Sequence, residues 1–175
     1  MSLFRFLGLG EDPEKRRESG DTESVRRIAA KLERLDPDRA RYLASFAYVL
    51  ARVANADLEI DATETTEMER SLAAISDLSE SEIALAVEIA KSQARLIGGT
   101  ENYVVTREFR KNSTPEQRGR LLQCLYAVAA ADGTISSVES SEIVGIAEEL
   151  GFTRMEANAL KSQYREKLSV LQKKR

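Results

Sequence analysis

The chain contains an internal repeat, and this repeat limits its fold more than any other feature of the sequence. The stretch VANADLEIDATETTEME, residues 53–69, aligns without gaps with VAAADGTISSVESSEIV, residues 128–144, at a constant offset of 75 residues. Seven aligned positions are identical, and they include three acidic pairs: Asp57/Asp132, Glu64/Glu139 and Glu67/Glu142. Because neither copy is expected to bury its apolar stripe alone, we expect the two copies to pack as one bundle.

The residue types present exclude several classes of enzyme. The 175 residues include no histidine and one cysteine, and the formal net charge is −3. Without histidine there is no catalytic triad of the usual kind, no histidine general base and no imidazole metal ligand. Cys124 lies in the apolar run LLQCLYAVAAA, where we expect a small buried side chain. A single cysteine cannot form an intramolecular disulfide, which fits a cytoplasmic location.

Capping residues mark helix starts along much of the chain. A Ser, Thr or Asp side chain caps the first turn, and a Glu or Gln three residues later reaches back to the cap. This pairing occurs at Asp61/Glu64, Ser79/Glu82, Thr114/Gln117, Ser136/Glu139 and Thr153/Glu156. Apolar residues between the caps recur with helical spacing, and no segment alternates like a strand. We therefore predict an all-α fold, a duplicated helical-hairpin bundle of about eight helices.

The domain boundaries follow the same pattern. Residues 1–20 combine a short apolar segment, MSLFRFLGLG, with a charged linker, and residues 173–175 form a basic tail. Between them we predict a single all-helical domain, residues 21–172, with pseudo-repeats at about 37–97 and 114–172. The stretch GGTENYVVTREFRKNS bridges the two copies, and YREKLSVL is predicted to close the last helix.

The apolar N-terminal segment is too short for a transmembrane helix, because it runs for only about ten residues. We expect it to dock onto the bundle or a partner. A weak peripheral contact with a membrane surface is the alternative.

The repeated acidic loop has three interpretations. In the first, its polar residues only cap the helix that follows, Ile135 acts as a hydrophobic staple and Gly133 supplies a left-handed turn. This interpretation leaves Asp57 and Asp132 without an explanation. Both are expected near the C-terminal end of a helix, where the helix dipole disfavours a negative charge.

In the second interpretation a divalent cation, calcium, magnesium or manganese, compensates these charges through oxygen ligands. The residues that would supply the ligands are Asp57, Asp61 and Glu64 in the first copy and Asp132 and Glu139 in the second. The loop does not match an EF-hand, because Ala62 stands at the position of the EF-hand glycine and Met68 at that of the final glutamate. No other cofactor is expected.

In the third interpretation the two hairpins form an acidic docking face, on which Glu59, Glu67 and Glu142 contact a partner. Residues 57–88 contain ten acidic residues and one basic residue, whereas residues 154–175 contain seven basic residues and two acidic ones. Such segregation can steer a charged protein partner or favour head-to-tail homo-oligomers. The basic C-terminus lacks the interleaved aromatic residues of single-stranded nucleic-acid binding, so we expect no nucleic-acid partner.

The two copies resemble the signature of the tellurite-resistance protein B (TerB) family. That signature is a helix ending in a motif such as VAAADG, then an isoleucine, then an acidic residue four positions later. Both ANADLEIDATETTE and AAADGTISSVESSE are similar to it. The similarity covers roughly residues 22–170 and is greatest to a bacterial TerB-like branch with a short apolar N-terminus. Leu58 departs from the pattern, in which glycine is usual.

The resemblance implies a duplicated TerB-like helical bundle that acts as an interaction module. Acidic family positions suspected of binding cations would correspond to Asp57, Glu64, Asp132 and Glu139. We therefore predict a non-enzymatic cytoplasmic protein that docks a protein partner through its acidic loops, in a metal or tellurite stress response. The alternative is a divalent-cation sensor or chelator that uses the same loops. An enzyme ranks third, because nothing in the sequence places two carboxylates across a cleft.

Overall fold

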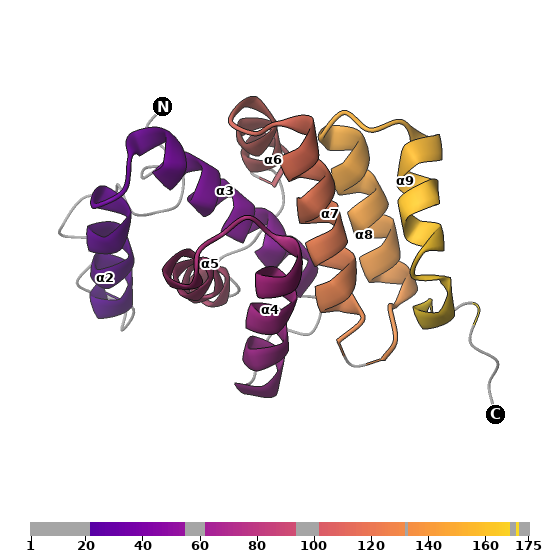
Figure 1. Cartoon of the computed structure of the whole chain (residues 1–175), viewed down its shortest axis with the longest axis horizontal. Helices are drawn as coiled ribbons and strands as arrows, with labels where there is room; N and C mark the ends of the chain where they lie inside the picture. Colours follow the sequence, from indigo (N-terminus) through magenta and orange to yellow (C-terminus); the bar gives the residue numbers. More distant parts are fainter. Residues whose placement is uncertain (1–21, 55–61, 94–101, 132, 169–170, 172–175) are drawn as a thin grey trace.

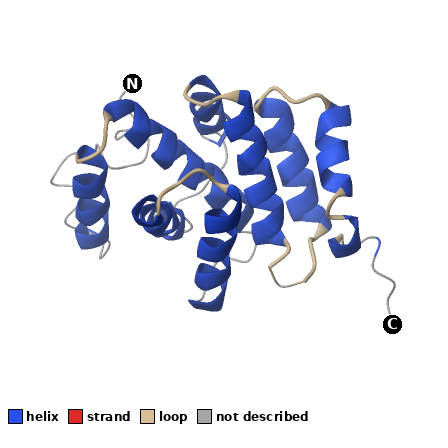
Figure 2. Ribbon diagram, viewed as in Figure 1, coloured by secondary structure: helices blue, strands red, loops and turns tan. Residues whose placement is uncertain are grey.

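The computed structural model describes residues 22–54, 62–93, 102–131, 133–168 and 171, so residues 1–20 and the tail 173–175 lie outside it. The described part contains eight α-helices and one short 3-10 helix: α2 (Thr22–Glu33), α3 (Pro37–Ala54), α4 (Ala62–Ile75), α5 (Glu80–Gln93), α6 (Asn102–Lys111), α7 (Pro115–Ala129), α8 (Ser137–Glu149), α9 (Arg154–Ser162) and η4 (Arg165–Lys167). Figure 2 shows only helices and connecting loops in these ranges. The prediction of an all-α fold is confirmed.

Four helices lie side by side in one layer (Figure 1). α4 packs against α7, α7 against α8, and α8 against α9. α3 runs obliquely across the molecule and packs against α5, α6, α7 and α8, and α2 packs on the outer side of α5. α4 and α8, which follow the two acidic loops in the sequence, begin at the same edge of the layer, the lower edge in Figure 1.

α3 is the central helix of the core. Its sequence, PDRARYLASFAYVLARVA, carries apolar or small residues on nearly every side after the first turn, which is typical of a helix without a solvent-facing stripe. Twelve of its 18 residues are buried. All of them except Ser45 belong to one hydrophobic cluster that also contains residues of α4, α5, α7 and α8. The two copies of the repeat therefore share one core.

The predicted caps are present wherever the structure describes them. Reciprocal hydrogen bonds of capping boxes are found at Ser79/Glu82, Thr114/Gln117, Ser136/Glu139 and Thr153/Glu156. Gly151, just after α8, has a φ of +94°, the left-handed conformation expected of a glycine at a helix C-terminus.

The segment that bridges the two copies contains a helix that the sequence analysis did not assign. This helix, α6, places Val105 and Phe109 in the core with no exposed surface. The Phe109 ring centroid lies 5.4 Å from that of Tyr42 and 6.1 Å from that of Phe46. α6 is therefore an integral part of the bundle as well as a connection.

The last helix ends earlier than predicted. α9 ends at Ser162, η4 follows, and Leu168 has an extended backbone with φ −68° and ψ 122°. The Lys167 carbonyl accepts a hydrogen bond from the backbone N–H of Ile135, at 2.7 Å. The prediction that YREKLSVL closes the last helix is wrong for residues 164–168, because contacts with the rest of the molecule hold these residues in a different conformation.

Candidate functional site

The second acidic loop connects α7 to α8, and several local interactions fix its course. Gly133 has a φ of +94°. This left-handed backbone conformation costs glycine little free energy and costs other residues more. The buried Ile135 donates its backbone N–H to the carbonyl of Lys167. Ser136 donates its N–H to the Glu139 carboxylate at 2.8 Å, and the Glu139 N–H donates to Ser136 Oγ at 3.1 Å. The carboxylate of Glu139 is thus held at the first turn of α8.

Glu142, in the second turn of α8, forms an ion pair with Arg52 of α3. The Arg52 side chain is only 6% exposed. Its Nη2 lies 2.7 Å from Glu142 Oε1, and its Nη1 lies 2.7 Å from Glu149 Oε2 and donates to Thr106 Oγ1 at 2.7 Å. Burial alone would lower the pKa of Arg52, but the hydrogen bonds with Glu149 and Glu142 outweigh it, so the pKa is raised. Arg52 therefore stays charged and joins α3, α6 and α8.

We predicted from the sequence that Glu142 contacts a partner. The ion pair with Arg52 fixes its position and partly neutralises its charge. One guanidinium faces two carboxylates, Glu142 and Glu149, so the cluster keeps a net negative charge. The Glu142 side chain is 38% exposed and the Glu149 side chain 22%. Arg52 thus holds two partly exposed carboxylates in fixed positions, which lowers the conformational entropy that each would lose on contact with a partner.

In the first copy the structure places one assigned residue fully. Glu67 of α4 lies 3.4 Å from Arg70 in a pair between exposed side chains one turn apart, which contributes little stability. The remaining assigned residues lie outside the described part of the chain: Asp57, Glu59, Asp61 and Asp132, together with the side chain of Glu64. Among the described side chains, no group of three or more acidic or cysteine residues is placed to hold a metal ion.

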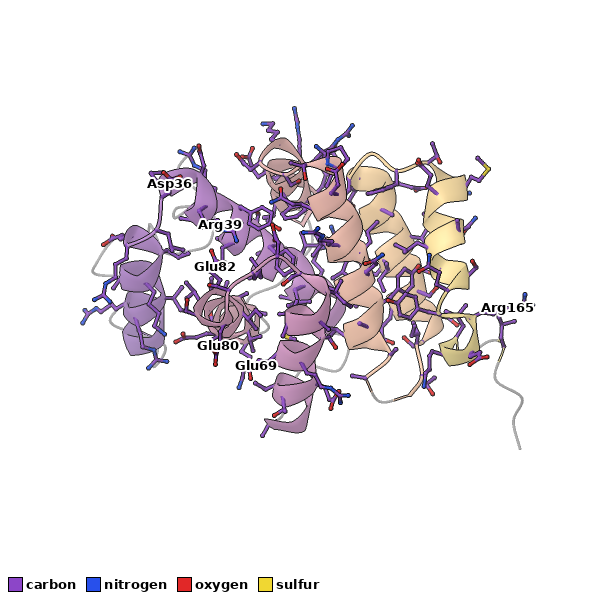
Figure 3. All side chains as sticks on the ribbon, viewed as in Figure 1. Asp36, Arg39, Glu69, Glu80, Glu82 and Arg165 are labelled. Atoms are coloured by element: carbon purple, nitrogen blue, oxygen red, sulfur yellow. The ribbon has the colours of Figure 1, made fainter. Side chains whose placement is uncertain are left out.

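Two of the three acidic residues of α5, Glu82 and Glu88, are paired with basic residues of the first half of the molecule. Arg39 of α3 binds Glu82 through two hydrogen bonds of 2.6 and 2.9 Å. Hydrogen bonding to Arg39 holds the pKa of the Glu82 carboxyl below its usual value. Figure 3 shows Glu82 on the side of α5 that faces Arg39, and Glu80 on the opposite side. Glu88 is bound by Arg27 and Lys31 of α2, at 2.6 and 2.9 Å.

The turn between α4 and α5 lies at the edge of the layer opposite the start of α4, and it is tied to two other helices. Asp77 accepts hydrogen bonds of 3.2 Å from Tyr42 of α3 and from Gln117 of α7. Burial, and then the negative charge of Asp77, raise the pKa of Tyr42. These hydrogen bonds fix the turn. They also engage the carboxylate of Asp77, which would otherwise add to an acidic surface.

Two residues show what the sequence analysis missed and what it identified correctly. Arg52 was not predicted to matter, although it is the one charged residue in the apolar part of α3 that follows Arg41, and a charged residue in such a setting is a signal of a buried ion pair. Cys124 was expected to be buried, and it has no exposed surface. Burial raises the pKa of its thiol to about 12, so it remains protonated and is a poor nucleophile at neutral pH.

Two copies of three helices, α3–α5 and α7–α9, around one shared core define a class of duplicated all-α domains. The family model described as tellurite resistance protein TerB matches residues 42–162, which is more than half of the chain. The chain therefore belongs to the TerB family, which is generally non-enzymatic.

No curated protein and no solved structure matches the chain. Within the described ranges, no helix combines the length and the apolar character needed to cross a membrane.

Proposed function

We propose that this TerB-family chain is a non-enzymatic interaction module of the cytoplasm, which docks a protein partner in a metal or tellurite stress response. The docking surface would be the edge of the helical layer at which α4 and α8 begin. It would include Asp57, Glu59 and Asp132 from the loops and Glu142 from α8.

One observation carries this proposal: both helices that follow the acidic loops begin at the same edge of the layer (Figure 1). The loops directly precede these helices in the sequence, so their carboxylates are expected at one surface. The pairing of Glu82 and Glu88 with basic residues of α2 and α3 leaves this edge as the better candidate for an acidic face. Fixed charges of one sign favour fast, salt-sensitive association with a basic partner.

Partner capture by the purified chain tests this function. A variant with Asp57→Asn, Glu59→Gln and Asp132→Asn is expected to recover about tenfold less of a specific partner than the wild type, because rim charges control association with charged partners. The control is Glu116→Gln, which changes an exposed acidic residue where α7 begins, at the opposite edge. Direct binding of the purified partner is then measured at low and high salt. Equal recovery by the loop variant and the control would contradict the proposal.

The cation-sensor alternative makes a different prediction for the same loops. A ligand that binds only the folded state raises the melting temperature as its concentration increases. Since the Glu139 carboxylate already accepts the cap hydrogen bond of Ser136, we expect calcium, magnesium and manganese to leave the melting temperature unchanged. Differential scanning fluorimetry with each ion is the measurement. A dose-dependent rise that is lost in Asp57→Asn or Asp132→Asn would place the sensor function first.

A further inference from the structure

The segment after α9 is bound to the second acidic loop. We call residues 163–168 the C-terminal strap. Its backbone reaches the loop through the hydrogen bond from Ile135 N–H to the Lys167 carbonyl, and Ile135 and Leu168 form an isolated parallel β-bridge. Leu168 is only 5% exposed and belongs to the hydrophobic core cluster. The strap therefore covers part of the surface that the loop would otherwise present.

An aromatic contact fastens the other end of the strap to α7. The ring of Tyr164 stacks on the ring of Tyr126, with centroids 5.1 Å apart and planes 16° apart. The Tyr164 hydroxyl donates to the carbonyl of Gln123 at 3.3 Å. The buried Tyr126 hydroxyl, in contrast, has no hydrogen-bond partner in the described part of the chain. The strap thus packs an aromatic ring on Tyr126, whose buried hydroxyl stays unsatisfied at a cost in free energy.

The conformation of the strap conflicts with its own sequence. Residues 162–168, SQYREKL, contain neither glycine nor proline, and most of them are good helix formers. Ala157, Leu160, Tyr164 and Leu168 also have the spacing of one continuous helical face. The chain nevertheless leaves the helix after Ser162. Contacts with α7 and the loop must therefore impose the break, and such conflicts between local preference and observed structure are common at functional sites.

The strap follows α9, a helix at the periphery of the bundle (Figure 1). α9 packs on α8, and Ala157 is its only buried residue. By comparison, α5, the third helix of the first copy, packs along the central helix α3 and buries several apolar side chains. Elements with little buried apolar surface open at a lower free-energy cost than the core. We therefore expect the opening of α9 together with the strap to cost less free energy than the opening of the core helices.

The strap has a net charge of +1, from Arg165 and Lys167 against Glu166, and it lies beside an acidic segment of the chain. Arg165 and Lys167 are exposed, and Figure 3 shows Arg165 projecting away from the bundle. Residues 132–149, the loop and α8, contain five acidic residues and no basic residue. A segment that inserts an apolar side chain into the core and carries exposed basic residues next to it suits a surface beside this acidic segment.

We propose that the C-terminal strap occupies, within the same chain, the surface at which a partner binds, and that the partner resembles it. The partner would present a basic segment with an aromatic residue and a leucine four residues apart, and its backbone would pair with Ile135. This proposal rests on the proposed docking function and assigns its partner class. Docking then requires release of the strap, so the covered state of the chain is the inactive one.

A peptide of the strap sequence itself, SQYREKLSVL, serves as the probe. Its binding to full-length chains is followed by fluorescence anisotropy. The variant Leu168→Ser weakens the strap and is expected to bind the peptide about tenfold or more tightly than the wild type, in which a tethered competitor has a high effective concentration. Leu171→Ser is the matched control, because Leu171 is 49% exposed and close in sequence. A peptide with serine in place of its first leucine is expected not to bind.

Hydrogen exchange shows whether the variant keeps its fold. In Leu168→Ser the amide of Ile135 should exchange faster, while amides of α7 such as that of Leu125 keep their protection. If α7 also loses protection in Leu168→Ser, the variant Tyr164→Ser is used in place of Leu168→Ser. Loss of α7 protection in both variants, or equal peptide binding by all chains, would overturn the proposal.

The outcomes also separate this proposal from the docking function. Peptide binding to Leu168→Ser, with partner recovery unaffected by the loop substitutions, would support the strap site and contradict docking through the loops. Equal binding of the purified partner to wild type and Leu168→Ser would support docking and show that the strap does not cover the docking surface.

Discussion

Replacing Arg52 with alanine is expected to lower the free energy of unfolding by about 3 kcal/mol. The substitution leaves Glu142 and Glu149 facing each other without the guanidinium that lies 2.7 Å from each of them. It also removes the donor to Thr106 Oγ1 and opens a cavity beside α3. Because both carboxylates are partly exposed, the cost should be at the lower end of that for breaking a buried pair. Urea denaturation followed by circular dichroism measures it.

Two variants distinguish the ion pair from general effects of losing an arginine. Arg52→Lys keeps the charge but not the planar guanidinium. Its free energy of unfolding should therefore lie between those of the wild type and Arg52→Ala. Arg120→Ala removes an exposed arginine from α7 and should change stability by no more than about 0.5 kcal/mol. If Arg52→Ala cost no more than Arg120→Ala, the ion pair would contribute nothing to the joining of α3 and α8.

Replacing Phe109 with alanine is expected to cost about 4 kcal/mol of unfolding free energy. Phe109 has no exposed surface, and its ring packs near those of both Tyr42 and Phe46. The substitution removes apolar area from the core and leaves a cavity that surrounding helices can only partly fill. Thermal and urea denaturation would both report the loss.

Tyr103, on the same helix, provides the matched control. Its side chain is 56% exposed, so Tyr103→Ala should change stability by no more than about 0.5 kcal/mol. Phe109→Leu should cost about 1 kcal/mol, because leucine keeps much of the buried apolar surface. Similar effects of Phe109→Ala and Tyr103→Ala would mean that α6 is a connection and not a part of the core.

Features that depend on residues close together in the sequence could be predicted. The capping box at Ser136 and Glu139 requires two residues three positions apart, and its hydrogen bonds are present. The repeat, the helical periodicity and the family resemblance gave the correct fold class for the same reason. The burial of Cys124 followed from its apolar neighbours in the sequence.

Features that depend on distant residues could not be predicted. Arg52 and Glu142 are 90 residues apart in the sequence, and only packing brings them together. α6 begins with Asn102 and continues through Tyr, Val, Val and Thr, residues of modest helix propensity, so its helix depends on burial of Val105 and Phe109. The strap shows the reverse case, in which good helix formers are held out of an α-helix by contacts with α7 and with the second acidic loop.

The burial of α3 on nearly all sides has a consequence for how the chain folds. α3 belongs to the first copy, yet it packs against α7 and α8 of the second and against α6 between them. A nascent chain that ends before α6 would leave apolar faces of α3 in water. The shared helix should therefore delay stable folding until both copies have been synthesised and make the duplicated domain unfold in one cooperative step. Although the sequence is duplicated, neither half can act as an independent folding unit.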